Sequence, residues 1–412
     1  MAAGVTQPGG AGTTIYIYDD ASSASGTGYT FAEIAAAFPA DFVDLGTSAK
    51  SYRAKTFLQV GDTGTGTATT TLVDTSSSVF FDTSKTLLYR STQTTSWNTN
   101  LGAKVGSGDQ SSGKTGTFLY LGAGATFRGN LAIHGCTIKV NTSLAFNGAG
   151  VTQDLSNNII ESTTGASFTG GTASLYNADF THAGTQYALA AMDVSTAERL
   201  TAGGTGALAH AFPTSSFTVK DLAMFGTPSL ADLFPQVASL GGRNWRLVRP
   251  KFSGTVQKFY PWGFMSSDPD LAPQEMWLFD VKCADSDGVG VASIPVKLTD
   301  NEGNAQVDTV TDSTGQLSFG SGITADAVTV ADWYQSGGTT LLVRHRSPFL
   351  LECNYPTQTG YNSNYASHRF YFNWPGYQTI TTTAGSFEDC NLVLSMAPPA
   401  SGGSTWVERV VP

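Results

Sequence analysis

Large apolar residues recur every 19 to 22 residues between positions 125 and 183, and this repeat constrains the fold more than any other feature. Gly, Asn, Thr and Ser, which favour turns, occupy the intervals. A period of this length is typical of a solenoid, in which each repeat stacks its large side chains on those of the coil below. The three series are Phe127, Phe146 and Phe168; Ile133, Leu155 and Leu175; and Ile138, Ile160 and Phe180.

The repeat predicts a right-handed parallel β-helix over residues 50–265. Each coil would hold two or three short strands, and the large side chains of the three series would point into one continuous core. One or two further coils are expected, at residues 216–226 and 244–254. The segment 102–116 is rich in Gly and Ser, so we expect a long polar loop there.

The composition also indicates an all-β protein. Charged residues make up 13% of the 412 residues, whereas 46 are Gly, 24 are Phe and 15 are Tyr. Thr, Val, Tyr and Phe suit pleated surfaces and Gly suits turns, so most of the chain favours strands. Only one segment predicts a helix, because Thr30 and Glu33 have the spacing of a capping box and Pro39 follows.

The charge argues against nucleic-acid binding, since a net charge of −10 gives no basic surface for phosphates. The densest basic stretch is residues 241–252, which predicts either an anion or sugar site or else a solvated face or a contact to an acidic neighbour; we favour the latter pair. Residues before Lys50 include no Lys or Arg, and the apolar runs are short. We therefore expect no secretory signal, no membrane span and synthesis in the cytoplasm.

The four cysteines stand singly in the sequence, as Cys136, Cys283, Cys353 and Cys390. No two of them have the CxxC spacing of a metal or redox site. Each lies among apolar residues, so we predict buried thiols in preference to a disulfide.

A β-helix can carry a glycosidase site, which needs two carboxylates on one face. The candidates in the repeat are Asp154, Glu161 and Asp179. Glu161 occupies the same place in its coil as Lys139 and Thr181, so these three should stack and Glu161 should form an outward ion pair. Asp154 and Asp179 fall in different strand series beside turn residues. The sequence therefore predicts no catalytic, cofactor-binding or metal-ligating residue, and no enzymatic activity.

Beyond residue 270 apolar and polar residues alternate between Asp- and Gly-containing turns, which predicts paired strands. The turn Asp312–Gly315, the stretch Pro375–Tyr377 and the last strand, Asn391–Leu394, resemble the carboxypeptidase-regulatory-like and transthyretin-like modules. The resemblance implies an antiparallel Ig-like β-sandwich over 266–397 with an insertion at 324–370. Such modules display or brace other parts and rarely catalyse.

Two turns of this region carry paired acids, Asp285 with Asp287 and Asp300 with Glu302, which predict either Ca²⁺ ligands or plain β-turns. The distant Glu of a full calcium loop is missing, so we favour plain turns. Aromatic residues near the insertion could form a sugar- or protein-contact patch or belong to the module's own core. They are Tyr355, Tyr361, Tyr365, Phe370, Tyr371, Phe372 and Trp374.

The order of segments is an N-terminal arm and short helix at 1–49, the β-helix, the sandwich and a tail at 398–412. This arrangement looks like a tailed-bacteriophage virion protein. The resemblance implies a non-enzymatic structural component, with a capsid decoration or spike protein favoured over a tail or baseplate component. The alternatives from other classes are a tailspike polysaccharide depolymerase and a carbohydrate-binding adhesin. Converging acids would favour the first, and an exposed aromatic platform the second.

The tail ends in an apolar group after a flexible linker, which predicts docking onto a neighbouring subunit. The expected assembly contacts are Trp406, Val407, Val410 and Val411. Expected partners are other virion proteins, such as major capsid or tail proteins, and copies of the chain itself, with a trimer favoured; a host surface glycan is a further candidate. We expect no cofactor, and we place the protein in the virion, assembled in the host cytoplasm.

Overall fold

The computed structural model has one short helix among the residues it describes, α1 (Phe31–Ala37), and is otherwise built of strands in several sheets. The helix lies where the sequence predicts it, and none of the described helices is long and apolar enough to span a membrane. The chain divides into two compact units, of which unit 2 comprises residues 218–222, 238–251 and 261–412 and unit 1 the remainder. The described residues are 5–17, 31–45, 51–60, 196–204, 217–226, 245–252, 272–336, 340–376 and 387–397, with short strands between 73 and 182.

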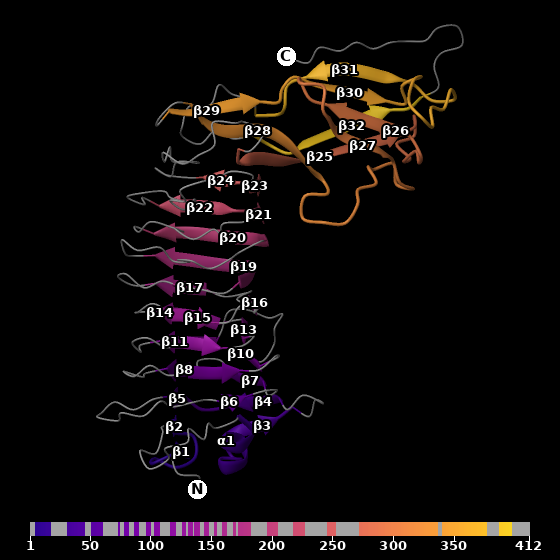
Figure 1. The fold of residues 1–412 in the computed structure, drawn as a ribbon. Coiled ribbons are helices and arrows are strands. Elements are labelled where there is room, and N and C mark those ends of the chain that lie inside the picture. The colour runs from indigo at the N-terminus through magenta and orange to yellow at the C-terminus, as the bar shows by residue number, and fades with distance from the viewer. Residues whose placement is uncertain are drawn as a thin grey trace. The chain divides into compact units, whose positions relative to one another are not determined.

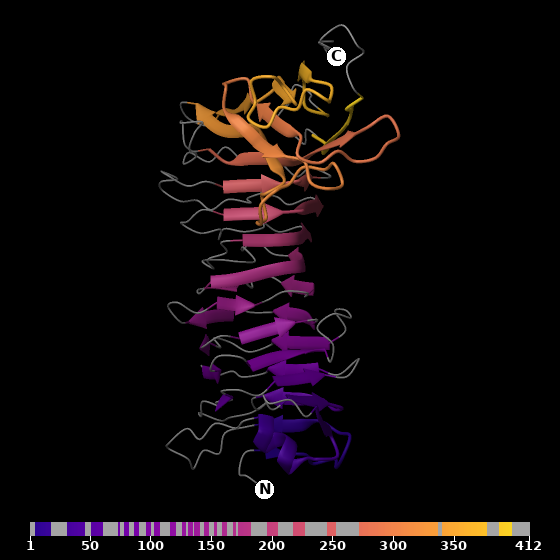
Figure 2. The ribbon, with the colours of Figure 1, turned by 90° about the vertical axis from the view of Figure 1, so that its right-hand side faces the viewer.

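Unit 1 contains three columns of strands in which each strand pairs in parallel with the next (Figures 1 and 2). The first column is β2 (Ile15–Ile17), β5 (Leu58–Val60), β8 (Thr86–Tyr89), β11 (Gly116–Tyr120), β14 (Cys136–Val140), β17 (Ile159–Ser162), β19 (Thr172–His182), β20 (Thr196–Gly204) and β22 (Ala223–Gly226). The second is β4 (Ser51–Ala54), β7 (Ser78–Phe81), β10 (Ala103–Ser107), β13 (Leu131–His134), β16 (Thr152–Asp154) and again β19. The third is β6 (Val73–Asp74), β9 (Ser96–Thr99), β12 (Thr126–Arg128), β15 (Leu144–Asn147) and β18 (Phe168–Thr169).

One register position in the first column is apolar from strand to strand. Its residues from β11 to β22 are Phe118, Ile138, Ile160, Phe180, Ala202 and Met224, so 20 or 22 residues separate each from the next. The series Ile138, Ile160 and Phe180 is thus confirmed in its pairing. Ile133 of the second series lies opposite Val105, whereas Leu155 lies outside the described residues. The burial expected for these side chains also lies outside what the structure describes.

The first series is confirmed only in part. Phe127 lies opposite Phe146, as predicted, but Phe168 lies opposite Leu144 and not opposite Phe146. An offset of two residues leaves a strand's side chains on the same face, so the apolar pattern alone cannot distinguish the two registers. The predicted polar loop 102–116 is also wrong in part, because it contains β10, whose Val105 pairs with Val79.

Residues 5–13, which belong to the predicted N-terminal arm, are packed against their own chain. β1 (Val5–Thr6) pairs antiparallel with β2, and the side chain of Val5 is buried. The buried carboxylate of Asp41 accepts hydrogen bonds from Gln7 Nε2 (2.8 Å) and from the backbone N–H of Gly12 (2.7 Å). Close by in the sequence, β3 (Phe42–Asp44) pairs antiparallel with β4.

Unit 2 contains two sheets that share one hydrophobic core. In the first, β25 (Gln274–Ala284) pairs antiparallel with β28 (Ala327–Ser336) and parallel with both β23 (Trp245–Val248) and β32 (Cys390–Ser395), and β29 (Thr340–His345) pairs with β28. The second is antiparallel, in the order β27 (Ala305–Val310), β26 (Pro295–Thr299), β30 (Phe349–Cys353) and β31 (His368–Phe372). The remaining strands are β21 (Phe217–Lys220) and β24 (Lys251–Phe252). The first sheet is therefore mixed, whereas the sequence predicts antiparallel pairing throughout.

Alternation of apolar and polar residues builds the core of unit 2. Inward positions on β25 are Trp277, Phe279, Val281 and Cys283, and those on β30 are Phe349, Leu351 and Cys353. Segment 324–370, expected as an insertion, supplies four strands to the two sheets. The aromatic candidates divide accordingly: Phe372 and Trp374 are in the core, whereas Tyr361 and Tyr371 are exposed.

The turn Asp312–Gly315 holds Gly315 against the backbone of β25. Its φ is +80°, and a Cβ atom there would lie 2.3 Å from the carbonyl oxygen of Cys283. Gly303 has a similar φ of +88° but open space around it. We expect Gly315→Ala to lower the free energy of unfolding by about 2–3 kcal/mol, and Gly303→Ala by about 1 kcal/mol, because only the first adds a backbone collision to the left-handed conformation. Urea titration of both variants measures this difference, and equal losses would show that the close approach costs nothing.

Candidate functional site

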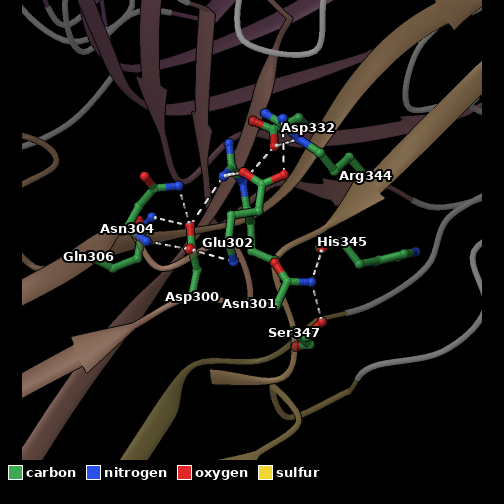
Figure 3. Close-up of polar contacts among 10 residues, drawn as sticks. Asp300, Asn301, Glu302, Asn304, Gln306, Asp332, Arg344, His345 and Ser347 are labelled. Carbon is green, nitrogen blue, oxygen red and sulfur yellow. Dashed lines mark hydrogen bonds and ion pairs between the residues drawn. The ribbon is translucent and has the colours of Figure 1, made fainter. Parts of the chain in front are cut away.

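The densest group of charged side chains in the described part of unit 2 is a cluster of three acids and two arginines (Figure 3). Asp300 and Glu302 lie in the turn between β26 and β27, Asp332 lies on β28, Arg344 on β29 and Arg346 just beyond it. We call these five residues the arginine–carboxylate cluster. Because β26 and β28 belong to different sheets, the cluster joins the two sheets of unit 2.

The carboxylate of Asp300 stabilises the turn between β26 and β27. One carboxylate oxygen accepts from the backbone N–H groups of Glu302 (3.0 Å) and Asn304 (2.8 Å). The other accepts from Asn304 Nδ2 (3.2 Å), Gln306 Nε2 (2.9 Å) and Arg346 Nη1 (3.1 Å). The side chain is fully buried, so these five donors replace the water that a carboxylate would otherwise bind.

Asp332 holds both arginines through one oxygen atom. Its Oδ2 accepts from Arg344 Nε (3.0 Å), its cross-strand partner, and from Arg346 Nε (2.7 Å). Within the described structure its Oδ1 is buried and accepts no hydrogen bond. Burial raises the pKa of Asp332, and the two guanidinium groups, Arg346 more than Arg344, oppose this shift.

Glu302 completes the cluster from the solvent side, with its side chain 37% exposed. Its carboxylate forms ion pairs with Arg344 Nη1, at 3.2 Å, and with Arg346 Nη1. The neighbouring Asn301 donates from Nδ2 to the carbonyl oxygens of His345 (3.0 Å) and Ser347 (2.8 Å). The whole turn is thus fastened to the chain that links β29 to β30.

The residues of the arginine–carboxylate cluster are suited to a structural role. A guanidinium group keeps its proton at any ordinary pH, so neither arginine can act as a base. The oxygens of Asp300 are occupied by protein donors, one of them the Arg346 guanidinium group, which leaves them unsuited to bind a calcium ion. Among the residues that the structure describes, no group of three or more His, Cys, Asp or Glu side chains could hold a metal ion.

The other paired-acid turn is also a plain turn, as favoured from the sequence. Asp285 Oδ1 accepts from the backbone N–H groups of Asp287 (2.9 Å) and Val289 (2.9 Å). The N–H of Gly288 donates to the carbonyl oxygen of Asp285 at 3.1 Å. These bonds are those of an Asx turn, in which the Asp side chain stabilises its own loop.

Sequence reasoning also missed a buried acid on β25. Glu275 is fully buried, and its two oxygens accept from the indole N–H groups of Trp277 (3.1 Å) and Trp333 (3.2 Å). The sequence offers only a weak signal, since Glu275 directly precedes the apolar run 276–279 at the start of the strand. Like the cluster, this carboxylate is held by donors of its own unit.

The three acids considered for glycoside hydrolysis are placed by their strand register. Glu161 lies opposite Lys139 on one side and Thr181 on the other, which confirms the predicted stack. Asp154 pairs with Ala132 and Ser174 in the second column, whereas Asp179 pairs in the first column with Ile159 and Thr201. The side chains of these residues lie outside the described structure.

The basic stretch 241–252 contacts acids in the part that is described. Arg249 Nε lies 3.2 Å from Asp221 Oδ1 and 3.4 Å from Asp389 Oδ2. Of the two favoured interpretations, a solvated face and a contact to an acidic neighbour, Arg249 shows the acidic contact.

The four predicted assembly contacts, Trp406, Val407, Val410 and Val411, lie outside the described residues. Comparisons of the chain with protein-family models, with curated proteins and with solved structures found no match.

Proposed function

We propose that this chain is a non-enzymatic structural component of a bacteriophage particle, with a capsid decoration or spike protein favoured over a tail or baseplate component. The observation that carries the proposal is the unbroken parallel pairing of the first column from β2 to β22. Strands that pair in this way, one every 20 or 22 residues from β11 onward, suit a scaffold that grows by stacking identical units.

We further propose that the three columns are the faces of a right-handed parallel β-helix. Strand-to-strand crossovers between parallel strands are overwhelmingly right-handed, which gives the handedness. Three ladders that recur in the same order, with strands of two to five residues over most of their length, support this winding. The unit 2 sheets would then form the Ig-like sandwich module that the turn Asp312–Gly315 suggests.

The contacts of the buried acids in unit 2 support a structural role. Asp300 and Asp332 bind arginines, and Glu275 binds two indoles. Catalytic acids need free lone pairs directed at a substrate, whereas these carboxylates bind side chains of their own unit. We propose as partners other virion proteins and further copies of the chain, with a trimer favoured, assembled in the host cytoplasm.

Particle composition tests the proposal. Density-purified phage particles that encode this chain should contain it in a fixed number of copies, and deletion of residues 398–412 should lower its occupancy because Trp406 and the three Val residues are lost. The deleted chain should still melt cooperatively. Absence of the full-length chain from purified particles would contradict the proposal.

The enzymatic alternative has its own test. The purified chain should release no oligosaccharide from host capsule or lipopolysaccharide in reducing-end and unsaturated-product assays. Release that disappears in Asp154→Asn, Glu161→Gln or Asp179→Asn would instead identify a tailspike depolymerase. Glycan binding without cleavage, lost when the exposed Tyr361 and Tyr371 are replaced by Ala, would indicate an adhesin.

A further inference from the structure

Two buried cysteines face each other across the core of unit 2. Cys283 is the last inward residue of β25, and Cys353 is the last residue of β30. The two strands belong to different sheets, yet the Sγ atoms lie 3.4 Å apart. Both side chains are fully buried and both thiols are free in this structure.

We propose that Cys283 and Cys353 form an inter-sheet disulfide when the chain folds in the presence of a low-molecular-weight disulfide such as oxidised glutathione. The sulfur atoms need to approach by only about 1.4 Å to reach bonding distance. Because both side chains point into the shared core, the two sulfur atoms are already in contact before the bond forms.

The reaction balances as two exchange steps. One cysteine thiolate attacks a sulfur of the small disulfide and expels one thiolate, which leaves a mixed disulfide on the protein. The second cysteine thiolate attacks the protein sulfur of that mixed disulfide and expels the other small thiolate. The two protons lost by the cysteines go to the two released thiolates, so the protein is oxidised by two electrons and the small disulfide is reduced to two thiols.

The environment of Cys283 and Cys353 determines when during folding the disulfide can form. In the folded unit, the contact with Cys283 and, after it, burial raise the pKa of Cys353, which keeps it a thiol and therefore a poor nucleophile. The full burial of both residues also excludes a small disulfide. Exchange is accordingly expected while the two sheets assemble, and the same burial then protects the finished bond from reductants.

Cys390 supplies the matched control. It lies on β32, opposite Phe279 and four residues along β25 from Cys283, and it is equally buried. Burial raises the pKa of Cys390 to about 12. No thiol contact involves Cys390 among the described residues, so it should remain reduced under the same conditions.

The test uses the full wild-type chain, made by cell-free synthesis either with oxidised and reduced glutathione or with a phosphine reductant. Peptide mapping without reduction should find one cross-linked peptide, joining Cys283 to Cys353, only in the glutathione sample. Closing a loop between residues 70 apart should also raise the melting temperature of unit 2 by about 10 °C relative to the reduced chain.

Two variants sharpen the result. Cys390→Ala should keep the cross-linked peptide, and Cys353→Ala should lose it. Four free thiols in the wild-type chain from the glutathione sample, or a cross-link that includes Cys136 or Cys390, would overturn the proposal. The mapping does not depend on either variant folding, because it is read first on the wild-type chain.

Discussion

Replacing Arg346 by Met should lower the free energy of unfolding of unit 2 by about 3–5 kcal/mol. The guanidinium group is the one that binds all three acids of the arginine–carboxylate cluster. Its loss leaves Asp300 and Asp332 buried, with Arg344 as the remaining cation of the cluster. Methionine keeps much of the aliphatic bulk, so the loss measures the charge and its hydrogen bonds. Urea unfolding followed by Trp fluorescence gives the value.

Asp332→Asn is the matched control for this variant. It leaves two carboxylates against two guanidinium groups, and the amide oxygen can still accept from either arginine. We expect a loss of no more than about 1 kcal/mol. A loss below about 1 kcal/mol for Arg346→Met, or equal losses for the two variants, would contradict the role assigned to the cluster.

The wild type and Asp332→Asn should also differ in how their stability depends on pH. The pKa of Asp332 in the folded chain is raised above its ordinary value of 3.8, so the unfolded chain releases this proton at lower pH than the folded chain. The stability that the protonated carboxyl contributes is therefore complete below pH 3.8 and is lost as the pH rises through the folded pKa. The stability of the wild type relative to Asp332→Asn should fall over this interval and level off above it. A rise over the same interval would show that the arginines outweigh burial.

Replacing Trp374 by Ala should cost about 3–5 kcal/mol, the usual range for removing a large aromatic from a core. The indole is 1% exposed and its ring centroid lies 5.2 Å from that of Phe349 and 6.0 Å from that of Phe279. Its Nε1 donates to the carbonyl oxygen of Glu388 at 2.7 Å, so truncation also leaves that acceptor without its donor.

Tyr371→Ala is the control, since this ring lies only three residues away and is 47% exposed. Its loss should stay below about 1 kcal/mol. Thermal and urea unfolding of both variants provide the comparison. If the Trp374 variant unfolded at the wild-type denaturant concentration, the shared core of the two sheets would not be what stabilises unit 2.

The repeat could be predicted from the sequence because each strand of a column pairs with the strand one repeat further along the chain. Residues that pair across neighbouring strands recur at the length of one repeat, so the spacing of Ile138, Ile160 and Phe180 predicts their register. Apolar spacing does not predict the register where an offset of two residues preserves the apolar face, as at Phe168. It does not predict the strand itself where few residues are apolar, as in β10.

The cluster and the cysteine pair could not be predicted in the same way, because each is assembled from segments far apart in the chain. Arg344 and Arg346 share a spacing of two, which suggests one face of a strand, but nothing nearby identifies Asp300 as a partner. Likewise, alternation places Cys283 and Cys353 on inward faces, whereas only the packing of two sheets brings their sulfur atoms together. Local patterns determine which face a residue occupies, and tertiary packing determines what that face meets.

Spin-label distances along the first column test the central proposal, that unit 1 is a stack of coils in register. Thr117, Thr137 and Thr201 share one register position, with Ile159 and Asp179 between the last two. In a chain with Cys136→Ser, labels on cysteines at 117 and 201 should be separated by about 19 Å, and labels at 137 and 201 by about 14 Å, because each coil adds one interstrand spacing. A separation above about 35 Å for the first pair, or the same distance for both pairs, would contradict the stacked account.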